Sequence, residues 1–268
     1  MSTTDTASTA AAWRGLAIPD IAGQAVLVTG GSGGIGRAVA IGFAAVGAKV
    51  IVQFFAGEAA AESVAEEIAA AGGEAALVRF DASDNEAVAE GVREAIAVHG
   101  RLDGLINNAG SMLGRAPFET AETEHLDYVF AVNARSVVVA SRVALPALKA
   151  SRGYIINTTS IAARNGGSTG ASIYGAAKGF VATATRGMAK EFAGYGIRVN
   201  AVAPGVILTP FHERDSTQAQ LDAALTGIPL GRLGIPDECV GAYLYLASPM
   251  LSGYVTGQSI EVNGGQLM

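Results

Sequence analysis

The sequence is poor in the residues that form disulfides and metal sites. Its 268 residues include one cysteine, Cys239, and three histidines. A lone cysteine cannot form a disulfide within the chain, which favours a reducing compartment, so we expect a cytoplasmic protein. His99, His125 and His212 are far apart in the sequence and lack the spacing of metal ligands, so we expect no bound metal.

Positive charge and long apolar runs are also scarce. Lysine and arginine together number 18 against 24 aspartates and glutamates, and the net charge of −6 argues against binding to nucleic acid or to an anionic membrane. No uninterrupted apolar run reaches the roughly 18 residues that a membrane-spanning helix needs. Residues 1–20 lack a basic start followed by an apolar run, so they predict a disordered tail rather than a secretory signal.

Glycine, by contrast, is abundant. The chain has 35 glycines and only 8 prolines, and 50% of its residues are hydrophobic. The glycines follow no Gly-X-Y period, which excludes collagen, and the apolar content excludes wholesale disorder. A chain of this length and composition can bury the core of one large α/β domain.

Short apolar runs alternate with longer helical patterns along the chain. The expected strands cover residues 25–29, 49–54, 75–80, 105–107, 154–158, 198–203 and 259–262. The expected helices cover residues 36–47, 59–71, 85–99, 122–150 with a break near Asn133, 174–195 and 237–247. This alternation predicts an α/β fold, a single-domain doubly wound parallel sheet of the Rossmann type with about seven strands and helices on both faces, over residues 21–268. The longest stretch without clear regular structure is 204–228, and we expect a lid over about 206–228.

A glycine-rich loop lies between the first expected strand and the first expected helix, at residues 29–36 (TGGSGGIG). Glycine lets the backbone turn sharply and approach a phosphate closely, and the following helix offers free N–H groups to an anion. This is where an open α/β sheet binds a dinucleotide pyrophosphate. The candidate contacts are Gly30, Ser32, Gly33, Gly34, Ile35 and Gly36. A tight strand–helix turn without a ligand is the alternative.

The same glycines also match G-x-S-x-G, the nucleophile elbow of α/β hydrolases, at residues 30–34 and again at 166–170. The first match follows the first strand, so no earlier strand is present to build an oxyanion loop. The second match has no strand directly before it. A hydrolase is therefore disfavoured.

Tyr174 and Lys178 lie four residues apart at the start of an expected helix, so both side chains can point into one cleft. A neighbouring ammonium favours the phenolate and lowers the pKa of a tyrosine, which makes such a pair a general acid–base device. Ser160 and the segment 107–110 (NNAG) each follow an expected strand. They are therefore expected at the carboxyl edge of the sheet, where such folds bind ligands.

Taken together, the motifs resemble those of the short-chain dehydrogenase/reductase family. The matching residues are 29–36 (TGGSGGIG), 107–110 (NNAG), Ser160, 174–178 (YGAAK) and 200–205 (NAVAPG), and the resemblance covers about residues 23–268. It implies an oxidoreductase that transfers a hydride between a nicotinamide cofactor and a secondary alcohol or ketone, without a metal. Family members usually form homotetramers, which the Ala- and Val-rich helices at 122–150 and 174–195 would suit.

The resemblance also implies a role for each matching residue. Tyr174 matches the acid–base, and Lys178 matches the lysine that lowers its pKa and holds the nicotinamide ribose. Ser160 matches the serine that hydrogen-bonds the reacting oxygen. Asn133 matches an asparagine that holds a water in a proton relay, although it could equally cap a helix. Further cofactor contacts are implied for Asp81 and Ala82 near the adenine, for Asn107, Ala109 and Gly110, and for Pro204, Gly205, Ile207 and Thr209 along the nicotinamide.

The end of the second strand bears on the choice of cofactor. An acidic residue there binds the ribose 2′-hydroxyl of NAD and repels the 2′-phosphate of NADP. Phe54 occupies the expected position, so NADP(H) is favoured and NAD(H) remains possible. The basic residue that NADP-binding members often carry in the glycine loop is replaced by Gly33, and Arg37 is the nearest cation. The Phe54 ring could pack on the adenine or simply in the core.

The substrate is less constrained by the sequence. Candidate contacts are Ser111, Ala162, Ser168, Phe211 and His212, with Met112 and Asn165 nearby. The small polar flank at 164–168 favours a sugar, a polyol or another small polar carbonyl compound. The pattern is similar also to 3-oxoacyl-carrier-protein reductases, whose acidic carrier would require a basic surface, for which Arg115, Arg135 and Arg142 are candidates. A nucleotide-binding protein without catalysis is a remote alternative, because Ser160, Tyr174 and Lys178 are all present.

Overall fold

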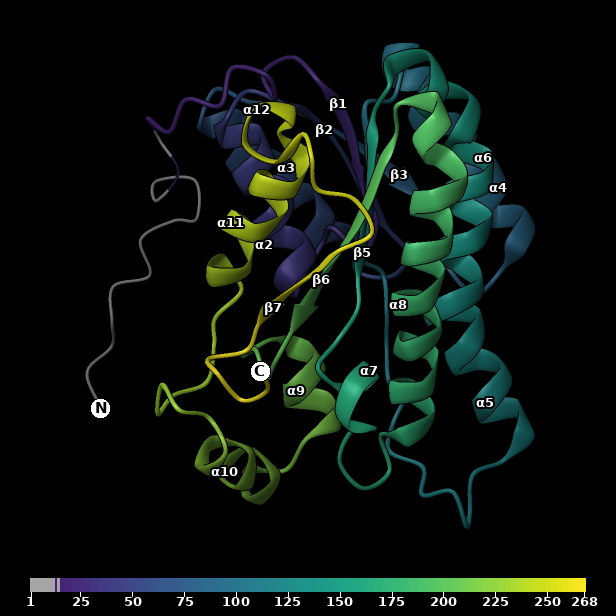
Figure 1. Ribbon diagram of the computed structural model, residues 1–268, viewed down its shortest axis with the longest axis vertical. Helices are drawn as coiled ribbons and strands as arrows, with labels where there is room; N and C mark the ends of the chain where they lie inside the picture. The colour runs from purple at the N-terminus through teal and green to yellow at the C-terminus, as the bar shows by residue number, and fades with distance from the viewer. Residues whose placement is uncertain (1–12, 14) are drawn as a thin grey trace.

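The computed structural model describes residue 13 and residues 15–268. Within these residues, seven strands form one sheet in the order β3-β2-β1-β4-β5-β6-β7, and every neighbouring pair is parallel (Figure 1). The strands are β1 (Ala25–Val28), β2 (Lys49–Phe54), β3 (Glu74–Arg79), β4 (Gly104–Asn107), β5 (Tyr154–Thr158), β6 (Arg198–Pro204) and β7 (Ser259–Val262). The chain winds outward from β1 to β3 and then returns to β4 on the other side, so the predicted doubly wound fold is confirmed.

Helices cover both faces of the sheet (Figure 1). One layer consists of α2 (Gly34–Ala45), α3 (Glu58–Ala70) and α11 (Asp237–Ala247), and the other of α4 (Asn85–His99), α6 (Ser136–Ser151) and α8 (Ser172–Phe192). Strand β1 shows why both layers are needed. Val26 and Val28 belong to the core cluster under α2 and α11, whereas Ala25 and Leu27 belong to the cluster under α4 and α6. Successive strand residues point to opposite faces, so a strand that is apolar throughout must be covered on both.

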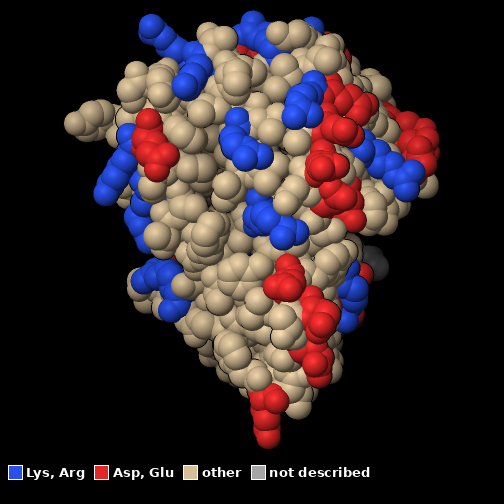
Figure 2. All heavy atoms as spheres, turned by 90° about the vertical axis from the view of Figure 1, so that its right-hand side faces the viewer, with Lys and Arg blue, Asp and Glu red and all other residues tan. Residues whose placement is uncertain are grey.

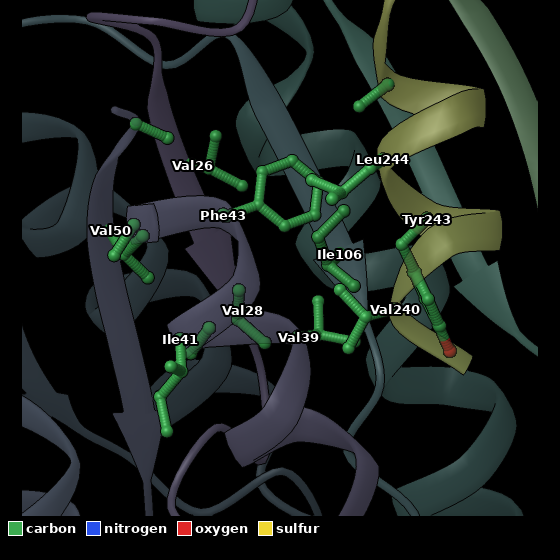
Figure 3. Packing of buried hydrophobic residues seen from close by; sticks show 14 of the residues in the cluster. Val26, Val28, Val39, Ile41, Phe43, Val50, Ile106, Val240, Tyr243 and Leu244 are labelled. Carbon is green, nitrogen blue, oxygen red and sulfur yellow. The ribbon is translucent and has the colours of Figure 1, made fainter. Parts of the chain in front are cut away.

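The first of these clusters contains a close contact between α2 and α11. Gly42 of α2 faces Val240 of α11, and a Cβ at Gly42 would lie 2.4 Å from a methyl group of Val240. Figure 3 shows Phe43 of α2 and Leu244 of α11 meeting over the sheet. Small residues at this crossing therefore let the two helices pack tightly beside the site described below.

The long helix expected at 122–150 is interrupted. It consists of α5 (Thr123–Phe130), a π-helical turn η1 (Ala131–Arg135) and α6. The π-helical turn contains Asn133, so the interruption lies where the sequence analysis expected a break. The Nδ2 group of Asn133 donates to the Val129 carbonyl at 2.8 Å. By length and composition alone, the run Thr123–Ser151 could cross a membrane. In this fold α6 packs against α4 and the sheet, as a core helix does.

The expectation of irregular structure over 204–228 is wrong in part, because this stretch contains α9 (Pro210–Asp215) and α10 (Gln218–Thr226). Thr217 and Gln220 form a capping box at the start of α10, and this pattern can be read from the sequence. Helix α10 has no buried residue, so it lacks the apolar period that marks the other helices. The remaining short elements are α7 (Ala162–Asn165), η2 (Ala193–Tyr195) and α12 (Pro249–Ser252).

The segment expected to be a disordered tail, residues 1–20, falls mostly outside the described residues, which exclude 1–12 and 14. Its described part packs on the domain. Ile18 is buried, and the Asp20 carboxylate accepts hydrogen bonds from the Ser248 hydroxyl at 2.7 Å and from the Met250 N–H at 2.8 Å. These contacts tie the chain before β1 to the region between α11 and α12.

Candidate active site

The loops that follow β1, β4, β5 and β6 meet in one cleft of about 700 Å³ at the carboxyl edge of the sheet. Strands β2 and β4 lie on opposite sides of β1, so the cleft lies where the chain reverses its direction across the sheet. The predicted residues that line it are Gly30, Ser32, Gly33, Gly34, Ile35, Ala109, Gly110, Ser160, Ala162, Ser168, Tyr174, Lys178, Pro204, Gly205, Ile207, Thr209, Phe211 and His212. The structure thus brings residues far apart in the sequence to one place.

The glycine loop ends in an open helix terminus. Helix α2 begins at Gly34, and no side chain among the described residues caps it at Gly33. Gly30 and Gly34 have φ values of +64° and +52°, which favour glycine. The free N–H groups and the positive end of the helix dipole face the cleft at this point. These features fit the pyrophosphate of a dinucleotide.

The loop is held in shape by hydrogen bonds from the neighbouring strands. The Asn108 side chain donates to the Thr29 carbonyl at 2.9 Å, and the Thr29 hydroxyl accepts from the Asn108 and Ala109 N–H groups at 2.9 and 3.0 Å. On the other side, the Gln53 side chain accepts from the Gly30 N–H at 2.7 Å. The cradle is therefore formed before any ligand enters, which lowers the cost of binding.

Ser160 and Tyr174 both line the cleft. Burial raises the pKa of Tyr174 to about 12, and the Ser160 hydroxyl has a smaller, opposite effect on it. The expected lowering by Lys178 is therefore not seen in this state. The Lys178 ammonium lies 5.7 Å from the centre of the Tyr174 ring, and desolvation of the phenol outweighs its attraction.

Lys178 is nearly enclosed, with 3% of its surface exposed. Its ammonium donates to the Thr158 carbonyl at 2.9 Å, and burial lowers its pKa to about 8. Asn133 does not line the cleft, but it lies next to Gly110, as Lys178 does. A Cβ at Gly110 would be 2.7 Å from the Asn133 Oδ1 and 3.0 Å from the Lys178 Nζ. The Asn133 amide bonds both the N–H and the carbonyl of Ser111, so it fixes the loop beside Lys178.

Several predicted residues do not line the cleft. They are Gly36, Phe54, Asp81, Ala82, Asn107, Ser111 and Asn133. Gly36 is part of the cradle, because a Cβ there would lie 2.2 Å from the Gly30 carbonyl oxygen. The Asp81 carboxylate accepts from the N–H and hydroxyl of Ser83, both at 2.8 Å. The Asn107 amide turns into the sheet and donates to the Asn157 side chain at 2.9 Å.

Comparison with known proteins identifies the family. Residues 30–266 match the family described as enoyl-(acyl carrier protein) reductase. The 3-oxoacyl-[acyl-carrier-protein] reductase of Synechocystis sp. is 38% identical over 250 residues, which cover 91% of this chain and 97% of that protein. The chain belongs to the short-chain dehydrogenase/reductase family. It is thus an oxidoreductase.

Solved structures of this short-chain dehydrogenase/reductase family agree with the assignment. An NADH-dependent reductase described as responsible for alginate metabolism, in complex with NAD, matches with a TM-score of 0.83 and 35% identity over 93% of this chain and 98% of that chain. A short-chain dehydrogenase from Burkholderia cenocepacia, in complex with NADP, matches with a TM-score of 0.86 and 31% identity over 92% and 99%. The family therefore binds NAD or NADP in this fold.

The structure adds residues that sequence reasoning on this short-chain dehydrogenase/reductase missed. Asn108 lines the cleft and braces the glycine loop, whereas its neighbour Asn107 points away. Alternation along β4 was the available signal, since adjacent residues at a strand end face opposite sides. Arg214 and Gln266 also line the cleft, and no local pattern marks them.

Two aromatic residues of α9 lie beside Tyr174. The Phe211 ring centre is 5.5 Å from that of Tyr174 and 5.2 Å from that of His212. The His212 Nδ1 is 2.9 Å from the Ser216 hydroxyl. Burial, with a further contribution from Arg115, lowers the pKa of His212, so the ring is neutral at pH 7.

Proposed function

We propose that this enzyme interconverts a small polar ketone, such as a sugar or polyol-derived carbonyl compound, and its secondary alcohol. The observation that carries the reaction type is the presence of Ser160, Tyr174 and Lys178 together in one cleft with a glycine cradle. A polar substrate is supported by Gln266, whose Oε1 is buried in the cleft wall without a hydrogen-bond partner among the described residues. A substrate hydroxyl group would supply that partner.

The residues act in reduction as follows. The bound nicotinamide supplies the hydride. The Ser160 and Tyr174 hydroxyls donate hydrogen bonds to the carbonyl oxygen, and Tyr174 passes its proton to that oxygen as negative charge develops. A pKa of about 12 keeps Tyr174 protonated at neutral pH, as a proton donor requires. Lys178, with a pKa of about 8, is mostly charged at pH 7 and stabilises the phenolate that remains.

NADP(H) is the cofactor that we favour, with NAD(H) as the alternative. No carboxylate stands at Phe54 to repel a 2′-phosphate. A hollow beside the glycine loop is lined by Ser32, Gly33 and Arg37, which suit that phosphate, and by Asp237, whose negative charge opposes it. The Arg37 guanidinium is paired with the Glu67 carboxylate, which moderates the preference. Turnover with each coenzyme at matched concentrations tests this proposal.

A 3-oxoacyl-carrier-protein reductase is the second candidate, supported by the Synechocystis relative. Its acidic carrier would need a basic surface. Arg115 lies in the cleft, where it bonds Ser168 and Asp215, so it is committed to the site rather than to an outer surface. Arg135 donates to the Ser83 carbonyl at 3.0 Å. A β-keto thioester in the substrate panel distinguishes the two candidates.

We also propose a cytoplasmic homotetramer. Large apolar side chains are exposed on the helical face formed by α5, α6 and α8, namely Leu126, Tyr128, Val138 and Phe180. Figure 2 shows this side of the molecule, where broad uncharged areas separate the charged groups. Such a face suits burial against another subunit. Light scattering on the purified protein measures the assembly.

The decisive experiment replaces the acid–base. Tyr174→Phe removes the hydroxyl, so turnover of ketoses, polyols and β-keto thioesters should be abolished with either coenzyme. Coenzyme binding, measured by calorimetry, should remain. Tyr254→Phe, at a fully exposed tyrosine, is the matched control and should keep full activity. Unchanged turnover in Tyr174→Phe would contradict the proposed mechanism.

A further inference from the structure

The cleft carries positive charge in a protein that is acidic overall. Arg115, Lys178 and Arg214 line it, and the described lining residues include no aspartate or glutamate. The whole chain has a net charge of −6. A cleft lined by charges of one sign concentrates ligands of the opposite sign. Lys178 belongs to the reaction centre, so the two arginines remain to be explained.

Arg115 spans a gap between two walls of the cleft. It comes from the loop between β4 and α5, and its guanidinium donates to the Ser168 hydroxyl at 2.9 Å and to the Thr169 carbonyl at 3.1 Å. It also donates to the Asp215 carbonyl at 2.6 Å and to the Ser216 hydroxyl at 3.2 Å. These bonds fix the planar group in the cleft. Among the residues that the structure describes, no carboxylate pairs with it.

Arg214 is held at the same place by a buried acid. Its guanidinium donates to the Asp215 carboxylate at 2.9 and 3.2 Å and to the Ser111 hydroxyl at 3.1 Å. The Asp215 side chain is 2% exposed, whereas that of Arg214 is 59% exposed. The Gly114 N–H donates to the same carboxylate at 3.3 Å. Asp215 therefore anchors Arg214 while its guanidinium stays open to the cleft.

Both arginines line the cleft that contains Tyr174, and a chain of side-chain contacts links Arg115 to that tyrosine. The rings of Tyr174, Phe211 and His212 are in consecutive contact. His212 bonds the Ser216 hydroxyl, which also accepts from Arg115. A substrate bound in this cleft can therefore meet both Tyr174 and Arg115. The hydrogen bonds of Arg115 use four of its five N–H groups, so one N–H and the positive charge remain for a substrate.

We propose that the substrate carries an anionic group, a carboxylate or a phosphate, which binds Arg115 and Arg214 while the carbonyl binds Ser160 and Tyr174. This inference rests on the proposed function, because it assumes that the same cleft turns over a ketone. A planar guanidinium matches the geometry of either anion, and bonds between ionised groups are the stronger ones.

The first test compares matched substrates in the wild-type enzyme with saturating coenzyme. One pair is a six-carbon keto acid and its methyl ester, and the other is a ketose phosphate and the free ketose. We expect kcat/KM to favour the charged member of one pair by roughly ten-fold or more. The pair with the larger ratio identifies carboxylate or phosphate. Equal use of charged and neutral members in both pairs would overturn the proposal, whereas the proposed function would stand.

The second test removes the cations. Arg214→Gln and Arg115→Gln should each raise KM for the charged substrate by roughly ten- to hundred-fold, with little change for the neutral partner or in coenzyme affinity. Arg186→Gln, on the exposed side of α8, is the matched control and should change neither. Equal losses for charged and neutral substrates would contradict the arginine assignment.

Calorimetric titration with the same keto acid and ketose phosphate keeps the test independent of turnover. The coenzyme-loaded enzyme should bind at least one of them, and Arg214→Gln should weaken that binding. If no ketone is turned over but this binding difference is found, the proposed function fails and the anion site stands. If neither anion binds, or if both arginine variants bind as the wild type does, the anion site is refuted.

Discussion

Replacing the buried lysine of the site should make the protein more stable while it abolishes activity. Lys178 is 3% exposed, and burial lowers its pKa from 10.5 to about 8. This fall means that the folded protein holds the charged form at a cost, because an ammonium loses its hydration when it is buried. Lys178→Met keeps a long flexible side chain of similar volume and removes the charge.

The expected gain in stability can be worked out from the pKa shift of Lys178. A fall from 10.5 to about 8 corresponds to roughly 3 kcal/mol of native-state cost. The substitution also leaves the Thr158 carbonyl without its 2.9 Å donor, which costs about 1 kcal/mol. Lys178→Met should therefore raise the free energy of unfolding by about 2 kcal/mol near neutral pH.

The gain should depend on pH in a fixed direction. The lysine pKa is lower in the folded than in the unfolded state, so the native-state cost is full below about pH 8. As the pH rises from about 8 toward 10.5, the wild type recovers this stability, whereas the variant has no such group to titrate. The difference between the two proteins should shrink over this window.

Urea denaturation followed by far-ultraviolet circular dichroism, without coenzyme, measures both effects at about pH 7 and about pH 10. Lys190→Met, at an exposed lysine on the same helix, is the control and should show no gain. A variant less stable than the wild type at neutral pH, or a difference that does not change with pH, would refute the reasoning.

Three further predictions concern the pH profile, the coenzyme and the cradle. The rate of reduction should stay level up to about pH 8 and fall above it as Lys178 loses its proton, and a profile without this fall would contradict the assigned role. Glu67→Gln removes the charge that pairs with Arg37, so KM for NADPH should fall by roughly two- to ten-fold with little change in KM for NADH. An equal fall in KM for both coenzymes would contradict a role of Arg37 in binding the 2′-phosphate. Gly36→Ala places a Cβ 2.2 Å from the Gly30 carbonyl oxygen and should lower the free energy of unfolding by roughly 2 kcal/mol. Gly187→Ala, whose Cβ would meet no atom within 4 Å, is the control and should not lower it. Urea denaturation measures both variants.

The fold, and the meeting of Ser160, Tyr174 and Lys178 in one cleft, could be predicted because their signals are local. Most strands are short apolar runs that end in a turn, and the longer helices repeat their apolar residues at helical spacing. Tyr174 and Lys178 share a helix face four residues apart, and Ser160 directly follows a strand end. Each of these motifs can therefore be recognised from a few neighbouring residues. The topology of the parallel sheet then brings the motifs together at one edge.

The substrate end of the cleft could not be predicted, because its contacts join loops that are distant in the chain. Arg115 meets Ser168 across 53 positions and Ser216 across 101. Only the path of the whole chain brings these loops together. The pKa of Tyr174 was missed for a related reason. The number of neighbours that exclude water from a phenol cannot be read from a spacing, and here desolvation outweighs the nearby ammonium.

The cleft leaves charge uncompensated at both of its ends. Lys178 beside Tyr174 and Arg115 beside Ser216 have no carboxylate partner among the described residues, although the chain carries an excess of acids. A cation without a counterion costs stability in a fold that could have supplied one. The cost is offset when negative charge arrives, as the phenolate of Tyr174 at one end and as the anionic group of the substrate at the other. Lys178, whose burial weakens the free enzyme, should therefore bind the transition state most strongly, and Arg115 should bind the anionic group of the proposed substrate.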